Sequence, residues 1–308
     1  MMSGRRFFET ASLGLAVALA FAPPARAESL TLDVRGLSRR LEVHVPPSGA
    51  KPRPLVIVLH GLSQPVTDLR RDLPLDAVAT GENFIAVYPE GIDKRWNYGR
   101  QLNRPMPLVD GVEVDDIALF RTLIARLAST GDVDPKRVYL LGVSNGGMMA
   151  YRAACEMDGE LAAVAAFISG MSEFQQVECT SARPAPLLML AGTGDTFQAY
   201  AGVAVLLGRL VSVPDTLDFF RRRHRCTGEE SEELPDRDPQ DGTTVTVVRA
   251  RGCQQGAELI FYRVNGGGHQ LPTLAPVDTR PHPRFGRANR DIDSAREAWN
   301  FFRRFKLP

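Results

Sequence analysis

Short runs of apolar residues recur along the chain and predict strands that are buried on both faces. These runs contain no regular polar alternation, which is typical of parallel strands covered by helices on each side. They lie at 55–59, 84–88, 138–141, 164–168 and 187–190. Residues 41–45 instead alternate between apolar and polar types, and they predict a strand with one exposed face.

Helical periodicity is found between these apolar runs. In 115–128 the apolar residues recur every three or four positions, at Ile117, Phe120, Leu123, Ile124 and Leu127. The two aspartates at its start suit a helix N-terminus, where carboxylates cap free N–H groups. Segments 145–157 and 292–305 also predict helices, and 243–250 and 258–264 predict two further strands. Such alternation predicts a single α/β domain with a mostly parallel sheet and helices on both faces.

The segment 221–242 departs from this pattern. A basic run, Arg-Arg-Arg-His-Arg, is followed by the acidic run Glu-Glu-Ser-Glu-Glu and by a stretch rich in Pro and Asp. Runs of charge are more often solvated surface than binding sites. We therefore predict a solvated helix end followed by a mobile loop.

The N-terminus has the three parts of an export signal. Arg5 and Arg6 supply a positive end, an apolar stretch follows at 11–22, and the small-x-small triplet Ala-Arg-Ala ends it at residue 27. The apolar stretch is shorter than the ~20 residues that span a bilayer. The pattern predicts a signal peptide at 1–27, of the ordinary or the twin-arginine type, and a secreted domain at 28–308. The alternative is an N-terminal core helix.

Charge narrows the expected partners. Lys and Arg number 37 against 36 acidic residues, a net charge of +1 that cleavage after residue 27 would change to −1. Because positive and negative charges are almost equal in number, the net charge gives no reason to expect nucleic acid as a partner. No later stretch is apolar enough for a membrane helix, and no cysteine near the cleavage site suggests a lipid anchor. The expected location is extracellular or periplasmic.

Export would permit the four cysteines to form disulfides. They allow three connectivities, and the nearest pairings are Cys155 with Cys179 and Cys226 with Cys253. We favour these two pairings because exported proteins commonly hold oxidised cysteines. The alternative is four buried free thiols.

The strongest chemical motif is Gly142-Val143-Ser144-Asn145-Gly146. It follows an apolar strand and precedes a helical segment, which is the context of the nucleophile elbow of α/β-hydrolases. The glycines allow a tight strand-to-helix turn that exposes the Ser144 hydroxyl and directs the Asn145 N–H at a developing oxyanion. The alternative is a strand–helix connection with an incidental serine.

A serine nucleophile needs a histidine base, and in this fold the chain order is serine, acid, histidine. Of the five histidines, His44 and His60 precede the serine, and His224 lies in the charged run. His282 lies in a loop rich in Pro and Arg. His269 follows a predicted strand and three glycines, which can present an imidazole freely, so His269 is the preferred base.

The acid should lie between serine and histidine, at the end of a strand. Asp195 follows the apolar run at 187–190 through Ala-Gly-Thr-Gly, and it would hold the His269 ring in its useful tautomer. The rivals Asp215 and Asp218 look like residues of an early helix turn, where an acid has a structural use. A second oxyanion donor is expected after the run at 55–59, and Leu62 N–H is our choice there, with His60 structural.

Several collinear stretches together resemble the extracellular polyhydroxybutyrate depolymerase and feruloyl esterase family of the α/β-hydrolases. They are Leu59-His60-Gly61, Tyr88-Pro89-Glu90-Gly91, Arg95-Trp96-Asn97, Val114-Asp115-Asp116, Gly142-Val143-Ser144-Asn145-Gly146-Gly147-Met148-Met149, Gly192-Thr193-Gly194-Asp195, Gly267-Gly268-His269, and Asp291-Ile292 ahead of Trp299-Asn300-Phe301-Phe302. The resemblance runs from about residue 40 to the C-terminus.

This resemblance implies hydrolysis of carboxylic esters by a Ser144–Asp195–His269 triad, without a metal or other cofactor. The implied substrates are feruloyl or acetyl esters of plant polysaccharide, or hydroxyalkanoate oligomers. The cysteine positions also resemble those of the family, which supports their oxidation. The rival functions are a non-catalytic binding protein on the same fold and a serine peptidase.

The pocket is the part that the resemblance defines least. Leu62, Gln270 and the alanine before Tyr200 depart from residues common in the family, so acyl and alcohol specificity stay open. Tyr200 is expected near the substrate. Trp96 and Asn97 either line the pocket or belong to a loop that packs on the core.

Overall fold

The computed structural model describes residues 26–99, 106, 108–181, 185–205, 208–275 and 280–308. The predicted signal peptide at 1–27 therefore lies almost wholly outside the described residues. Of the helices in the part that is described, none carries an apolar stretch long enough to cross a membrane.

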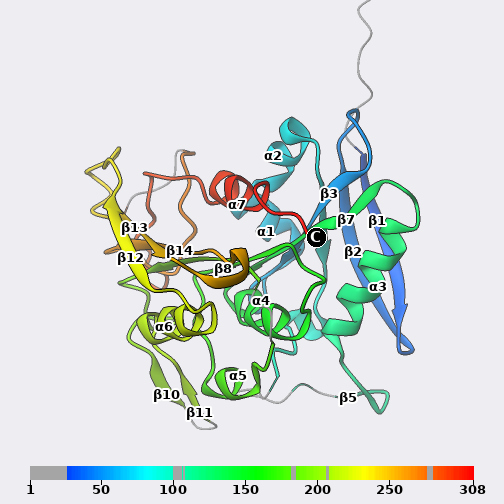
Figure 1. Cartoon of the computed structure of the whole chain (residues 1–308), viewed down its shortest axis with the longest axis horizontal. Coiled ribbons are helices and arrows are strands. Elements are labelled where there is room, and N and C mark those ends of the chain that lie inside the picture. Colours follow the sequence, from blue (N-terminus) through cyan, green and yellow to red (C-terminus); the bar gives the residue numbers. More distant parts are fainter. Residues whose placement is uncertain (1–25, 100–105, 107, 182–184, 206–207, 276–279) are drawn as a thin grey trace, which may run out of the picture.

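A large sheet forms the centre of the molecule (Figure 1). Among the described residues it has ten strands in the order β1-β2-β4-β3-β7-β8-β9-β14-β13-β12. Their bounds are β1 Arg26–Val34, β2 Leu37–Val45, β3 Arg53–Leu59, β4 Ile85–Pro89, β7 Val133–Val143, β8 Ala163–Phe167, β9 Leu187–Gly192, β12 Gly228–Glu233, β13 Thr244–Arg251 and β14 Leu259–Asn265. The strands from β4 to β14 pair in parallel, and the pairs at both edges are antiparallel. The prediction of a mostly parallel sheet is confirmed.

Helices cover both faces of this sheet. In Figure 1, α1, α2 and α7 lie on one side, and α4, α5 and α6 lie on the other together with α3. Their bounds are α1 Val66–Asp72, α2 Leu75–Glu82, α3 Asp116–Ala128, α4 Asn145–Glu156, α5 Glu173–Glu178, α6 Val213–Arg223 and α7 Ser294–Phe302. Short pieces complete the fold: strands β5 Leu108–Val109, β6 Val112–Glu113, β10 Val203–Val205 and β11 Gly208–Leu210, and the 3₁₀ turns Ile92–Lys94 and Gln254–Gly256.

Strand β3 shows why the central runs are apolar without interruption. Leu55, Ile57 and Leu59 enter the core under α3, α4 and α6. Val56 and Val58 enter the second core, under α1, α2 and α7. All five side chains are fully buried, because successive side chains of a strand point to opposite faces and both faces here are covered.

The charged segment 221–242 contains an element that the sequence did not predict. Its acidic run forms the edge strand β12, which pairs antiparallel with β13, so the prediction of a loop there was wrong. Glu232 pairs with Arg249 and Glu230 with Arg251, while the side chains of β12 stay largely exposed. An edge strand without a buried face has no apolar pattern to reveal it, and its charges block pairing with another chain.

The four cysteines form the two disulfides that the sequence favoured, Cys155–Cys179 and Cys226–Cys253. The first joins α4 to the end of α5, and the second joins the segment after α6 to the start of a 3₁₀ turn. Each bond therefore ties the C-terminal end of a helix, α4 or α6, to a later segment of the chain.

Candidate active site

Ser144 lies at a sharp turn between β7 and α4. Its φ of 55° and ψ of −114° are a strained backbone conformation for a residue with a side chain. Ser144 N–H donates to the carbonyl of Phe167 in β8 at 2.9 Å, which fixes the turn on the sheet. The flanking glycines are required sterically, because a Cβ on Gly142 would lie 1.9 Å from the carbonyl oxygen of Gly146. The sequence therefore dictates this turn locally.

The structure brings the three predicted triad residues together from distant parts of the chain. His269 Nε2 lies 3.0 Å from Ser144 Oγ, and His269 Nδ1 lies 2.7 Å from Asp195 Oδ2. All three residues are largely shielded from solvent, with Ser144 and Asp195 each 5% exposed. In this arrangement Nδ1–H donates to the carboxylate and Nε2 is free to accept the serine proton.

Asp195 is held by backbone as well as by histidine. Its Oδ1 accepts the N–H groups of Phe197 and Gln198, each at 2.8 Å, while Oδ2 faces His269. The rivals Asp215 and Asp218 lie in α6, as their sequence position predicted. One carboxylate oxygen is thus fixed by the chain and the other orients the imidazole.

His269 is anchored through a loop that comes later in the chain. Its backbone N–H donates to the carbonyl of Phe285 at 2.7 Å. Gly268 allows this approach, because a Cβ there would lie 2.0 Å from the same carbonyl oxygen. The Phe197 ring lies 5.0 Å from the imidazole, centroid to centroid. His282 lies in this later loop and His224 is buried against Phe220, so neither contacts the serine.

The two expected oxyanion donors belong to segments that adjoin Ser144. Asn145 is the first residue of α4, where the N–H has no partner within the helix. The loop after β3 passes close by, since a Cβ on Gly61 would lie 3.5 Å from the Ser144 Cβ. Leu62 is the next residue of this loop and is 51% exposed.

His60 sits beneath that loop and is completely buried. Its Nε2 accepts the N–H of Gly91 at 2.9 Å, so the proton is on Nδ1, which donates to the carbonyl of Gly61 at 2.7 Å. Burial lowers the pKa of His60 and keeps the ring neutral. The ring therefore holds the loops after β3 and β4 together, as the structural interpretation of His60 expected.

Trp96 does not line a surface pocket; its side chain is fully buried. Its indole N–H donates to the carbonyl of His60 at 2.9 Å, and its backbone N–H donates to Asn145 Oδ1 at 2.9 Å. The ring packs between His60 and Phe120, at centroid distances of 4.9 and 6.0 Å. Of the two interpretations offered for Trp96, the structure shows packing on the core. Here it joins the loops that carry both expected oxyanion donors.

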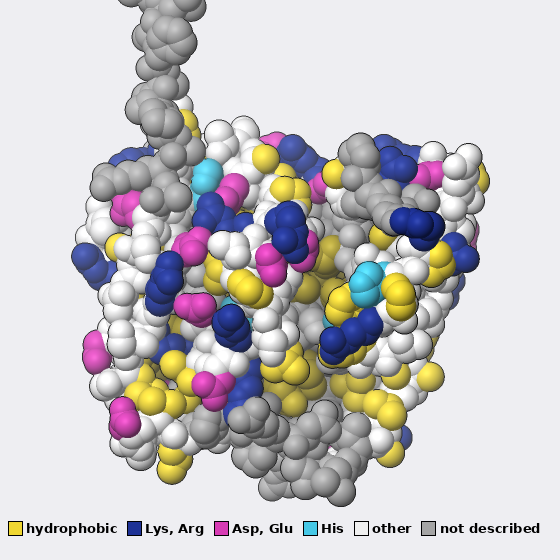
Figure 2. All heavy atoms as spheres, turned by 180° about the vertical axis from the view of Figure 1, so that it is seen from behind, with side chains coloured by type: hydrophobic (Ala, Val, Ile, Leu, Met, Phe, Trp, Pro, Cys, Tyr) yellow, Lys and Arg dark blue, Asp and Glu magenta, His cyan; other side chains and the backbone are white. Residues whose placement is uncertain are grey.

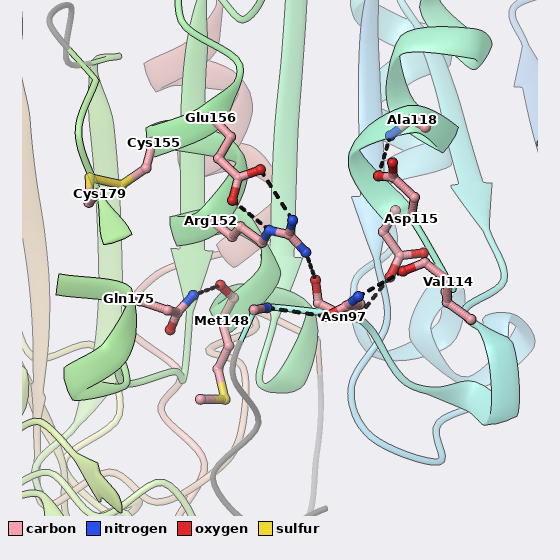
Figure 3. A network of polar contacts seen from close by, with 12 residues as sticks. Asn97, Val114, Asp115, Ala118, Met148, Arg152, Cys155, Glu156, Gln175 and Cys179 are labelled. Carbon is pink, nitrogen blue, oxygen red and sulfur yellow. Dashed lines mark hydrogen bonds and ion pairs between the residues drawn. A yellow bond between two sulfur atoms is a disulfide. The ribbon is translucent and has the colours of Figure 1, made fainter. Parts of the chain in front are cut away.

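Asn97 is likewise internal, at 8% exposure, and Figure 3 shows its contacts. Its side-chain amide donates to the carbonyl of Val114 and its own carbonyl accepts from Arg152, both at 2.7 Å. Its backbone N–H donates to Asp116, a carboxylate that forms a fully buried ion pair with Arg39 at 2.6 Å. Asn97 is therefore a brace between α3 and α4 and is not part of a pocket wall.

Tyr200 remains close to the site. It is half-buried, its N–H donates to the carbonyl of Asp195 at 3.4 Å, and its carbonyl accepts from Val213 at the start of α6. Burial raises the pKa of its phenol. Phe197 and Phe285 also lie beside the imidazole, and sequence reasoning missed both because their chain positions carry no motif.

Comparison with known proteins adds relatives that are esterases. No family model matches the chain. Feruloyl esterase B of Piromyces equi is 27% identical over 72% of this chain, which spans only 40% of that protein. Feruloyl esterase D of Neurospora crassa is 25% identical over 90% of this chain and 86% of its own length.

Solved structures show the same fold. An acetyl xylan esterase from Aspergillus awamori matches with a TM-score of 0.59 and 15% identity, over 80% of this chain and 94% of that one. The expected α/β-hydrolase fold is confirmed. The chain therefore has the α/β-hydrolase fold and is similar in sequence to feruloyl esterases.

Proposed function

We propose that the protein is an exported serine esterase whose triad is Ser144, Asp195 and His269. Ser144 Oγ attacks the ester carbonyl while His269 Nε2 takes its proton, and Asp195 stabilises the resulting imidazolium. The N–H groups of Asn145 and Leu62 stabilise the oxyanion, each typically worth ~2.7–4 kcal/mol of barrier. His269 then protonates the leaving alcohol, and water cleaves the acyl-enzyme by the reverse proton route.

One observation carries this proposal: the unbroken chain of contacts from Asp195 through His269 to Ser144, at 2.7 and 3.0 Å. Both distances lie within the hydrogen-bond reach that proton transfer between serine and imidazole requires. The strained turn at Ser144 supports it further, because strain of this kind persists where the surrounding structure enforces a functional geometry.

The proposed substrates are carboxylic esters of the kinds that the resemblance implied. Feruloyl or acetyl esters of plant polysaccharide come first, because relatives carry the names feruloyl esterase and acetylxylan esterase. Hydroxyalkanoate oligomers are the second class. Export to the periplasm or the medium is supported by the signal-like residues at 1–27 and by the two disulfides.

The test compares the wild-type protein with Ser144→Ala on 4-nitrophenyl acetate, 4-nitrophenyl butyrate and methyl ferulate. We expect kcat to fall by at least about 10⁴-fold, because the nucleophile is removed while the fold stays intact. A fluorophosphonate probe should label the wild-type protein and leave the variant unlabelled. Equal rates, or a folded wild-type protein that never labels, would contradict the proposal and favour a non-catalytic binding protein.

A further inference from the structure

The loop at 282–286 is ordered by its own hydrogen bonds and lies against the proposed triad. His282 and Gly286 exchange backbone N–H to carbonyl bonds at 2.8 and 2.9 Å. The imidazole Nδ1 of His282 accepts the N–H groups of Arg284 and Phe285, each at 3.1 Å. Because the Phe285 carbonyl also holds the backbone N–H of His269, the loop and the base keep a fixed relation.

Within this loop, the Arg284 guanidinium stands over two aromatic rings. Its Cζ lies 5.0 Å from the centre of the Phe197 ring and 5.3 Å from that of Phe285. The Phe197 ring is in turn 5.0 Å from the His269 ring. Cation–π contact within ~6 Å favours this position of the guanidinium. The positive charge of Arg284 is therefore connected to His269 through the Phe197 ring, which contacts both.

Arg284 is exposed, and no carboxylate in the described part of the chain pairs with it. Two half-buried arginines are by contrast paired, Arg290 with Asp238 at 2.6 Å and Arg249 with Glu232 at 2.9 Å, whereas the exposed Arg126 resembles Arg284 in having no ion pair with a described residue. Asp195, two residues before Phe197, is already engaged with His269. Figure 2 shows a hollow face on which basic side chains along one wall stand among hydrophobic side chains.

We propose that Arg284 is a specificity-determining residue that recognises a carboxylate on the ester substrate. A guanidinium presents its donors in a planar fork that fits a carboxylate. Contact with the Phe197 and Phe285 rings already restricts the guanidinium, so little side-chain entropy is lost when the anion binds. This inference rests on the proposed esterase function, and it selects esters that carry a negative charge near the scissile bond.

The experiment uses two matched pairs of esters with the full chain. Mono-4-nitrophenyl adipate and its methyl ester place the charge on the acyl side. 4-Acetoxybenzoate and its methyl ester place it on the alcohol side. The readout is the ratio of kcat/KM for the charged ester to kcat/KM for its neutral partner. The variants are Arg284→Gln, Arg284→Lys and the control Arg126→Gln, which changes an exposed arginine in the last turn of α3.

For at least one pair, we expect Arg284→Gln to lower this ratio about fivefold, as loss of a partly screened charge pair does. The neutral esters should react at unchanged rates. Arg284→Lys should recover part of the ratio, and Arg126→Gln should keep the wild-type value. Raising the salt concentration from about 0.05 to about 0.5 M should lower the wild-type ratio and leave that of Arg284→Gln unchanged.

Two outcomes would overturn the inference. If Arg284→Gln leaves both ratios unchanged, or slows charged and neutral esters alike, Arg284 does not select anions, although the esterase proposal stands. If the wild-type protein cleaves none of the four esters, the esterase proposal fails and the subsite fails with it. Matching thermal unfolding midpoints for wild-type and variant proteins would show that the ratios compare folded proteins.

Discussion

Each member of the proposed triad is held by main-chain bonds as well as by its neighbour. The backbone N–H of Ser144 donates to Phe167, and that of His269 donates to Phe285. The carboxylate of Asp195 accepts two backbone N–H groups on the oxygen that does not face the ring. The geometry is therefore set before substrate binds, which is what electrostatic preorganisation requires.

Asp195→Asn tests the acid at this scale. An amide in place of the carboxylate would favour the wrong imidazole tautomer, so kcat should fall about 10⁴-fold with little change in KM. The control is Asp215→Asn in the first turn of α6, an exposed site that should leave kcat unchanged. The measurement is steady-state kinetics of both variants on 4-nitrophenyl butyrate. A large loss in Asp215→Asn and none in Asp195→Asn would reverse the assignment.

At single residues, the sequence was informative where backbone geometry restricts the choice of amino acid. The elbow around Ser144 and the glycines before His269 are examples, because only glycine fits those close approaches. Trp96 was ambiguous, since an aromatic residue in a loop suits a pocket and a core equally well. Arg284 carried no signal, because its two aromatic partners meet it only in the folded chain.

At the scale of elements, the parallel pairing of β9 with β14 brings the acid and the base together. The register sets Val264 opposite Gly192, so the loops that follow the two strands meet at one sheet edge. Gly194 N–H donates to the carbonyl of Gly267 at 2.8 Å and joins those loops. Strand pairing thereby determines the distance between Asp195 and His269.

Gly192→Ala should disturb that junction. The new Cβ would lie 2.3 Å from the Gly267 carbonyl oxygen, so backbone must shift, at a cost of about 1–3 kcal/mol in the free energy of unfolding. We also expect a lower kcat, since the shift separates the acid from the base. The matched control is Gly81→Ala in α2, where a Cβ meets nothing and should stabilise the helix by about 0.5–1 kcal/mol.

Urea unfolding and steady-state kinetics on both glycine variants provide the measurement. If Gly192→Ala is as stable and as active as Gly81→Ala, the close packing of the two loops does not control the site. The pairing of β9 with β14 would then matter only for the fold.

Elements could be predicted where burial leaves a pattern. The runs of β3, β4, β7, β8 and β9 are apolar because both faces are covered, and each was expected close to its observed position. Strand β12 was missed because its side chains face solvent and leave no apolar pattern. Its glutamates form ion pairs with arginines of the neighbouring strand β13 at the edge of the sheet. Helix α5 was also not predicted, although the capping box between Ser172 and Gln175 at its start is a local signal that the sequence carries.

At the scale of the whole molecule, one hydrophobic core lies on each face of the sheet. The core under α3, α4 and α6 includes Phe220, which lies next to a buried histidine. His224 ends α6 at 1% exposure, next to Phe220 and close to the disulfide of Cys226. Burial lowers the pKa of His224 to about 4, so the ring is neutral in the folded protein at pH 7.

Acid should therefore destabilise the fold through this residue. The unfolded pKa is about 6.5 and the folded pKa is lower, so the unfolded chain binds the extra proton as pH falls. The stability is fully present above about pH 6.5 and is lost towards pH 4, by about 3 kcal/mol for this group. Urea unfolding at pH 7 and pH 4.5 should show a smaller loss for His224→Gln than for the wild-type protein. Equal losses would contradict the assignment.

The order of the chain has a consequence for synthesis. The turn with Ser144 and the oxyanion loops are synthesised early, whereas the base is added 125 residues after the nucleophile. A nascent chain that has not yet produced β14 holds a nucleophile with no partner to activate it. Esterase activity would thus appear only after His269 has been synthesised. Two fragments divided before β13 should each be inert, and only their reassociation should restore turnover.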